Sequence, residues 1–393
     1  MADHEAIDWE LVRHDFPVTE RMVYLNSAAG GPVSRAVMES ASRFYREMME
    51  EGDARWDVWL ARRELIRKRI ADYINADPEE IAFTTNTSSG MNLIVDALGG
   101  SGGEVISCDL EFPVSTIPWL HARVPVNSIE TSAGGGVDGG GVLRVGDVRR
   151  AMTERTGIIS VSHVQYSNGF RARLEELGGC KDGHKLVVNA SQSAGAFQLD
   201  VRRMRIDALC ATGHKWLLAG YGSGFVYLSR ELLARTEPRR IGWLSVENPF
   251  MMYNRSYVIR RDAAARAEHG CPHFAGIFAL GASLEQLMEI GPRNVEERVL
   301  SLNRYLTRRL SESAWKVLSP LQDESMRSGE TLVLAERPKR VVAQLARRGI
   351  AVTEKPRGFR VATHFFNNEA DLERLVEALD EVRRYGLNTG TGG

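Results

Sequence analysis

The sequence predicts an α/β fold, because short apolar runs of strand length alternate with longer segments of helical pattern along most of the chain. Two of these runs, 186–188 and 206–211, are closely followed by polar residues. In an open α/β sheet, ligands bind at the carboxyl edge of the strands. We therefore expect the polar residues of the stretch 189–215 to form a binding site around Lys215.

The composition indicates an ordinary protein with a large core. The chain has 393 residues, of which 43% are hydrophobic and 26% are charged, which is enough for two domains. Its 50 Lys and Arg residues balance 51 Asp and Glu residues, which argues against binding to nucleic acid or to a membrane surface. The N-terminal 1–20 is charged, and no later run approaches the ~20 apolar residues of a membrane helix. We expect a cytoplasmic protein that acts on a small molecule.

The cysteines give no sign of a disulfide framework or a zinc site. Cys108, Cys180, Cys210 and Cys271 are widely spaced and include no CxxC pair. This pattern is typical of reduced thiols, and we expect no metal.

The N-terminal part of the chain combines a small-residue segment with a long helical pattern. Residues 1–20 predict a short helix. The next segment, 26–31, reads NSAAGG, and its small residues let the backbone approach a ligand closely, although a plain turn has the same composition. The charged segment 34–75 has a helical pattern, on which Trp56 and Trp59 suit a core or an interface.

A hydroxyl-rich turn lies between a predicted strand at 81–84 and an apolar helix at 91–98. Free backbone N–H groups, the hydroxyls of Thr87 and Ser88, and the positive end of the helix dipole together suit a phosphate group. Simple N-capping by Thr87 or Ser88 explains the same residues. The phosphate interpretation gains weight from the lysine downstream.

The remaining pattern alternates strands and helices as far as the C-terminus. Further strands are predicted at 104–108, which leads to Phe112, and at 158–164, which leads to Tyr166. Helices around 279–291 and at 294–311 come next. The last of these is expected to cross into a small α+β domain. Its predicted strands and helices lie at 331–334, 341–348, 359–361 and 372–384.

Lys215 is the residue best suited to covalent chemistry. The sequence ATGHK places it directly after a predicted strand, among small and polar residues. A desolvated lysine amine can lose its proton and attack a carbonyl carbon to form a Schiff base. An exposed loop lysine is the alternative, and its companion residues argue against it.

These residues resemble those of class V, fold-type I pyridoxal-phosphate (PLP) enzymes, which include cysteine desulfurases, isopenicillin N epimerase-like proteins and cysteine-conjugate C–S lyases. The shared marks are the Gly-His-Lys ending at Lys215 and an acid-x-x-Gln motif ending at Gln192, in which Asn189 replaces the acid. The likeness runs from about residue 24 to about residue 379. It implies PLP as cofactor, a mostly parallel seven-stranded sheet in a large domain, and a smaller α+β domain.

The resemblance also implies roles for individual residues. Lys215 holds the cofactor aldehyde and acts as the base at Cα, and Arg360 takes the substrate's α-carboxylate, unless it forms only a salt bridge at the rim. The other implied cofactor contacts are Thr87 and Ser88 at the phosphate, Phe112 stacked on the ring unless it is a core residue, Tyr166 at the 3-hydroxyl, Asn189 at the ring nitrogen, and Gln192, Thr212 and His214. The implied substrate contacts are Asn26, Ala28 and Ala29.

A homodimer with active sites at the subunit interface is also implied by the resemblance. Gly270 and Cys271 are expected to reach the phosphate bound by the neighbouring subunit, through their backbone N–H groups. The expected domains are an N-terminal segment at 1–30 that packs with the small domain, a large PLP-binding domain at 31–292, the small domain at 293–384, and a disordered tail at 385–393.

Two departures from the family narrow the expected function. Desulfurases store sulfur on a mobile cysteine shortly before the carboxylate-binding arginine, but the segment 349–360 contains no cysteine. The family nearly always has Asp at position 189 to keep the ring nitrogen protonated, and the neutral Asn189 makes the ring a weaker electron sink. Transamination depends on that sink more than β-elimination does. We therefore expect a lyase that cleaves the C–S bond of a cysteine S-conjugate, in specialised sulfur or antibiotic metabolism.

Other reactions stay open at this stage. A decarboxylating or oxidative deaminase of a cysteine S-conjugate, an amino-acid epimerase and a class V aminotransferase would use the same lysine and arginine. A PLP-binding protein with little turnover is a further alternative, against which the presence of both Lys215 and Arg360 argues.

Overall fold

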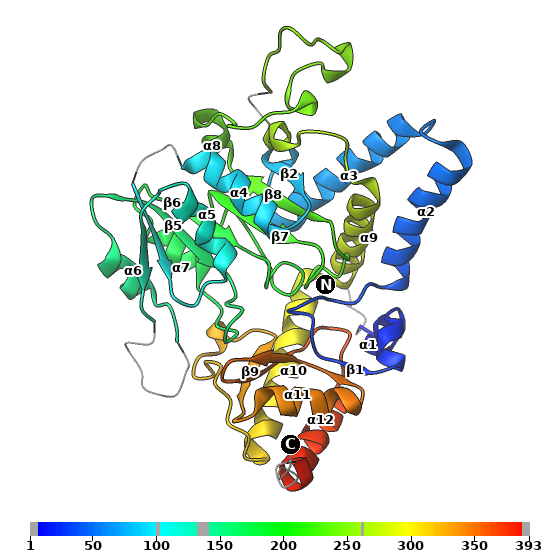
Figure 1. The fold of residues 1–393 in the computed structure, drawn as a ribbon, viewed down its shortest axis with the longest axis vertical. Helices are drawn as coiled ribbons and strands as arrows, with labels where there is room; N and C mark the ends of the chain where they lie inside the picture. The colour runs from blue at the N-terminus through cyan, green and yellow to red at the C-terminus, as the bar shows by residue number, and fades with distance from the viewer. Residues whose placement is uncertain (1–6, 100–102, 132–140, 261–262, 387–393) are drawn as a thin grey trace, which may run out of the picture.

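The computed structural model describes residues 7–99, 103–131, 141–260 and 263–386. The protein consists of a large domain around a central sheet and a smaller domain (Figure 1). The long helix α10 (Pro292–Glu312) and the N-terminal segment connect the two.

The central sheet confirms the predicted mostly parallel arrangement of seven strands. Their order is β2-β8-β7-β6-β5-β3-β4, and β8 alone runs against its neighbours. The strands are β2 (Ile81–Thr84), β3 (Glu104–Cys108), β4 (Val126–Ile129), β5 (Thr156–Ser162), β6 (Lys185–Asn189), β7 (Ala208–Thr212) and β8 (Gly224–Leu228). The sequence analysis missed β4, because this edge strand contains no buried residue and carries Asn and Ser at its centre.

Helices surround this sheet and form a projecting hairpin at one side. The helices of the large domain are α2 (Arg35–Glu51), α3 (Trp56–Ile74), α4 (Thr87–Leu98), α5 (Ile117–His121), α6 (Val145–Ala151), α7 (Leu174–Gly179), α8 (Arg230–Arg235) and α9 (Phe274–Ile290). α9 packs against α2 and α3, which extend from the body of the domain (Figure 1). The segment 34–75, which the sequence predicts to be helical, thus forms two separate helices. The break is at Gly52, whose φ of 64° ends α2.

The small domain is an α+β unit, as expected. Its antiparallel sheet has three strands in the order β11-β12-β9, and α10 and α11 pack on it. Its elements after α10 are β9 (Glu330–Leu334), α11 (Pro338–Arg347), β10 (Ile350–Ala351), β11 (Thr353–Lys355), β12 (Gly358–Ala362) and α12 (Glu369–Glu381). A final helical turn, Val382–Gly386, includes the first two residues of the predicted tail, and the rest of that tail, 387–393, lies outside the described residues.

The N-terminal segment joins the small domain to the loop that carries Lys215. After α1 (Trp9–His14), strand β1 (Val23–Tyr24) pairs in parallel with β10 of the small domain. The chain then turns toward the large domain, where the Gly31 N–H donates to the His214 carbonyl at 2.8 Å. A Cβ at position 31 would lie 2.2 Å from the Lys215 carbonyl oxygen, so this close approach requires glycine.

The apolar core follows the same division into domains. One cluster fills the small domain and includes Val23 and Leu25 of the N-terminal segment, while two others lie around the central sheet. In the part of the chain that the structure describes, no helix has both the length and the apolar character needed to cross a bilayer.

Candidate functional site

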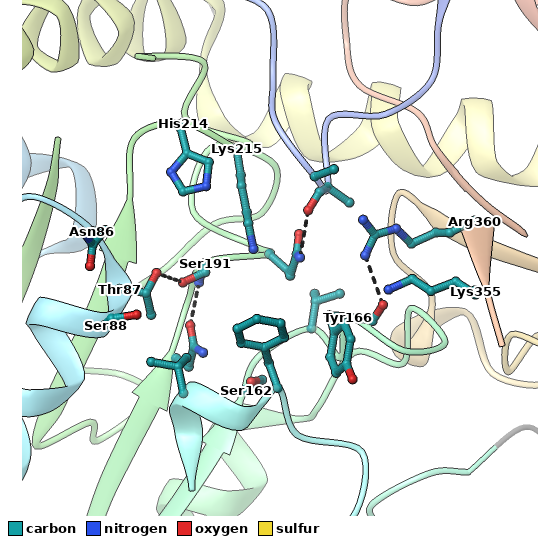
Figure 2. Close-up of a pocket in the computed structure, with 17 residues that line it drawn as sticks. Asn86, Thr87, Ser88, Ser162, Tyr166, Ser191, His214, Lys215, Lys355 and Arg360 are labelled. Carbon is teal, nitrogen blue, oxygen red and sulfur yellow. Dashed lines mark hydrogen bonds between the residues drawn. The ribbon is translucent and has the colours of Figure 1, made fainter. Parts of the chain in front are cut away.

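A cavity with about 950 Å³ of empty space opens at the carboxyl edge of the central sheet and is closed on one side by the small domain. The sequence-predicted residues that line it are Ala28, Ala29, Thr87, Ser88, Phe112, Tyr166, Asn189, Gln192, His214, Lys215 and Arg360. Figure 2 shows Thr87, Ser88 and Ser191 on one side and Tyr166, Lys355 and Arg360 on the other, with Lys215 between them. The fold therefore brings most of the predicted site residues together.

Lys215 lies in the turn that follows β7, and its amine points into the cavity (Figure 2). Burial, together with the positive charge of Arg360, lowers the pKa of Lys215 to about 8. Its Nζ lies 5.8 Å from the centroid of the Phe112 ring. About a tenth of this amine is thus uncharged, and nucleophilic, at pH 7.

His214 is held in place by two neighbours. Its ring stacks on Tyr221 with centroids 4.5 Å apart, and its Nδ1 is hydrogen-bonded to Thr212 Oγ1 at 2.8 Å. Burial and the charge of Lys215 lower the pKa of His214 to about 4, so the ring is neutral at physiological pH. The predicted cofactor contact Thr212 is buried beneath His214 and does not line the cavity.

The hydroxyl-rich turn forms the N-terminus of α4, as the phosphate interpretation requires. Asn86 caps the helix by accepting the Ser89 N–H at 2.9 Å. The Thr87 hydroxyl bonds Ser191 Oγ at 2.5 Å, which ties the helix to the turn after β6. The Thr87 and Ser88 N–H groups have no intrahelical partner because of their position in the first turn. An anion placed there meets N–H donors, hydroxyl groups and the positive helix end.

The orientation of the Asn189 amide is fixed by its neighbours. Its oxygen accepts the Ser191 N–H at 3.0 Å, and its nitrogen donates to Ser115 Oγ at 3.0 Å. Since a backbone N–H can only donate, the amide oxygen must face Ser191. One N–H group of the amide nitrogen is bonded to Ser115, and the other is therefore left for a group in the cavity.

Gln192 supports the N-terminal segment. Its nitrogen donates to the Ala28 carbonyl at 3.0 Å, and its oxygen accepts from Trp216 Nε1 at 2.7 Å. Both the nitrogen and the oxygen of this amide are therefore hydrogen-bonded within the protein. Gln192 thus fixes the position of Ala28 at the edge of the cavity.

Two neighbouring aromatic rings line the cavity. The rings of Phe112 and Tyr166 lie 5.0 Å apart and nearly perpendicular, at 85°. Phe112 is 44% exposed, which excludes the core position considered for it from the sequence. Its ring is available to stack against a ligand.

Arg360 enters the cavity from β12 of the small domain. It is 4% exposed, and its Nη1 donates to the Tyr166 carbonyl at 3.0 Å and to Glu330 at 3.2 Å. Its Nε is buried and without a hydrogen-bond partner among the described residues. Glu330 is buried behind it, and burial raises the pKa of this carboxyl. Arg360 is therefore held firmly, with donor capacity left for an anion.

The sequence analysis missed Lys355 and Glu330. Lys355 lines the cavity, and burial and the charge of Arg360 lower its pKa to about 8. The two-residue connection between β11 and β12 was the available signal, because it places Lys355 close to Arg360 in a hairpin.

Besides Thr212, three predicted site residues lie outside this cavity. Asn26 accepts a hydrogen bond from the Thr353 hydroxyl in the small domain. Gly270 and Cys271 line a neighbouring cavity, which shares Asn86 and Ser88 with the first. They are therefore close to the α4 N-terminus without facing Lys215.

Comparison with known proteins agrees with this geometry. A family model described as aminotransferase class-V matches residues 23–376. A probable cysteine desulfurase of Methanothermobacter thermautotrophicus is 28% identical over 96% of this chain and 98% of its own length. The isopenicillin N epimerase of Amycolatopsis lactamdurans is 26% identical, over 96% and 100% respectively. The apo structure of the cysteine desulfurase from Thermococcus onnurineus NA1 has a TM-score of 0.87 at 25% identity and covers 98% of this chain and 100% of its own.

Proposed function

The chain belongs to the class-V aminotransferase family, and on that premise we propose that it is a PLP-dependent lyase acting on cysteine S-conjugates. In the proposed reaction, an S-substituted cysteine and water yield a thiol, pyruvate and ammonia. The sulfoxide of such a conjugate would react in the same way but release a sulfenic acid in place of the thiol. The observation that carries the proposal is the position of the Lys215 amine, between an anion-binding helix terminus and a buried arginine.

Pyridoxal 5′-phosphate is the cofactor, and the residues present fit it. Thr87 and Ser88 offer hydroxyl and N–H donors for the phosphate, Phe112 offers a ring face, and Asn189 offers an N–H group for the ring nitrogen. When bound, the cofactor withdraws electrons from the Cα of an amino acid, while the protein chooses which bond breaks. The distribution of donors matches the distribution of charge on the cofactor.

Lys215 holds and moves the proton in this proposal. With a pKa of about 8, its amine is neutral often enough to take the Cα proton of the substrate and remains basic enough to keep it. The neighbouring His214 has a pKa of about 4 and is a poor proton acceptor at neutral pH. We therefore assign the role of base to Lys215 rather than to His214.

Arg360 orients the substrate by its α-carboxylate. One of its nitrogens is already bonded to Tyr166 and Glu330, which fixes the guanidinium plane and leaves its other donors for the two carboxylate oxygens. This contact places the Cα–H bond of an α-amino acid within the cavity that contains Lys215.

Elimination is favoured by the neutral Asn189 and by the lack of a persulfide-forming cysteine. Where Asp would stabilise a protonated ring nitrogen, the amide of Asn189 could offer only a neutral N–H group, so the cofactor would supply a weaker electron sink here. Elimination of a sulfur group from Cβ depends less on that sink than transamination does. Segment 349–360 has no cysteine, so sulfur is expected to leave as a free thiol.

We also propose that the protein is a cytoplasmic homodimer. Gly270 and Cys271 line a cavity next to the α4 N-terminus, where a neighbouring subunit's phosphate site could be completed. Cys108, Cys180 and Cys210 are buried free thiols, which suits a reducing compartment. Size-exclusion chromatography with light scattering tests the dimer.

The proposed function is tested by the products formed from a panel of cysteine S-conjugates. Pyruvate, ammonia and thiol should appear in equal amounts without any added oxo acid. A strict requirement for an oxo acid would identify an aminotransferase instead. Solvent deuterium at Cα of recovered substrate would identify an epimerase, and carbon dioxide release a decarboxylating deaminase. The absence of product in a single turnover would leave a PLP-binding protein.

A further inference from the structure

Lys355 gives the cavity a second fixed cation that the proposed reaction does not use. Its side chain extends from β11 into the cavity beside Arg360 (Figure 2). In the hairpin register, Thr353 lies opposite Arg360 and Lys355 follows two residues later. These three side chains therefore share one face of the small-domain sheet.

The charges around this cation are not balanced. Glu330 pairs with Arg360 at 3.2 Å, and Lys355 makes no salt bridge with any of the residues that the structure describes. The Lys355 Nζ lies 4.4 Å from the centroid of the Tyr166 ring, which attracts an ammonium group but carries no net charge. Glu330 also attracts Lys355 and Lys215, so this one buried carboxyl faces three cations, and an anionic ligand would offset the excess positive charge.

We propose that Lys355 binds a second anionic group, carried by the side chain of the substrate. This inference rests on the proposed function, in which Arg360 takes the α-carboxylate and Lys215 faces Cα. Lys355 then remains for an acid group beyond Cβ. The substrate class is accordingly cysteine S-conjugates whose sulfur substituent bears a carboxylate or a similar acid.

Two pairs of ligands with nearly equal shape test this charge preference. The first pair is S-carboxymethyl-L-cysteine and its amide, S-carbamoylmethyl-L-cysteine, and the second is L-glutamate and L-glutamine. Each is titrated into the PLP-loaded protein, and the change of the visible absorption band gives an apparent dissociation constant. In each pair whose members bind, we expect the dissociation constant of the acid to be about tenfold or more below that of its amide. This is the usual effect of a charge-assisted hydrogen bond.

Three variants assign the preference to Lys355. Lys355→Met should bring the acid and amide to within about twofold of each other, and Lys355→Arg should restore the preference. Lys339→Met, which removes an exposed lysine from α11 of the same domain, is the matched control and should retain the full preference. Equal binding of acid and amide by the unaltered protein, or a preference that survives in Lys355→Met, would overturn the inference.

The two proposals fail in different ways. If the visible band forms and amino acids perturb it, but acid and amide bind alike, the Lys355 subsite is wrong and the proposed lyase stands. If neither conjugate perturbs the band or yields pyruvate, the proposed substrate class fails, and the glutamate pair then decides the Lys355 subsite alone. If none of the four ligands perturbs the band, both proposals are overturned.

Discussion

Lys215 and Lys355 face the same cavity from different domains, and burial lowers the pKa of each to about 8. Their surroundings differ nonetheless. Lys215 lies in a turn at the carboxyl edge of the central sheet, where the backbone of Gly31 packs directly against it. Lys355 lies on a hairpin of the small domain, beside Arg360 and over the Tyr166 ring. Both lysines line the cavity and share a lowered pKa, and their positions distinguish a covalent role from an electrostatic one.

The largest expected difference between the two lysines is in the covalent bond to the cofactor. Lys215→Ala should abolish the borohydride-sensitive visible band and reduce kcat by about 10²–10⁴-fold, because it removes both the imine and the base. Lys355→Met should retain the band. Absorption spectra before and after borohydride measure this directly. A band that persists in Lys215→Ala would show that the two lysines have been assigned the wrong way round.

Of the two cations on the small-domain side of the cavity, Arg360 should contribute more to the free energy of unfolding than Lys355. Arg360 and Glu330 are 4% and 0% exposed, and removing only the arginine leaves a buried carboxyl without its partner. We expect Arg360→Met to lower the free energy of unfolding by about 3 kcal/mol, and the double variant with Glu330→Gln to recover part of that loss. Urea denaturation of the three proteins measures it. Equal losses in the single and double variants would contradict the pairing.

The large-domain side of the cavity could be predicted from sequence, because its residues follow strands closely along the chain. Thr87, Asn189 and Lys215 each come within a few residues of a strand end, and the sheet brings strand ends together. The prediction failed where contacts join distant segments. Neither the Glu330 contact with Arg360 nor the hydrogen bond from Gln192 to Ala28 has a local sequence signal. Thr212 lies at a strand end too, but its side chain is buried and hydrogen-bonded to His214, and it does not line the cavity.

The pH dependence of amine reactivity should distinguish the two lysines once the cofactor is present. In the cofactor-free protein, trace acetylation of both should rise about fivefold from pH 7 to pH 8 and by less than about twofold from pH 8 to pH 9, because the neutral fraction follows a pKa of about 8. Adding PLP should protect Lys215 and leave Lys355 reactive. Peptide mass spectrometry reads both sites at once, with Lys339 as the reference. Equal protection of the two lysines by PLP would contradict the separate roles.

The smallest expected effect concerns Thr212, which holds His214 in place on the side of the cavity that carries Lys215. Thr212→Val keeps the shape of the side chain but removes the hydroxyl that bonds His214 Nδ1 at 2.8 Å, at a cost of about 1 kcal/mol. Because His214 lines the cavity while Thr212 does not, we expect a loss of about fivefold in PLP affinity with the acid-to-amide preference at Lys355 unchanged. Thr212→Ser keeps the hydroxyl and should bind PLP normally. Fluorescence titration of the cofactor-free protein measures the affinity, and a change in the Lys355 preference would show that the two sides of the cavity are coupled.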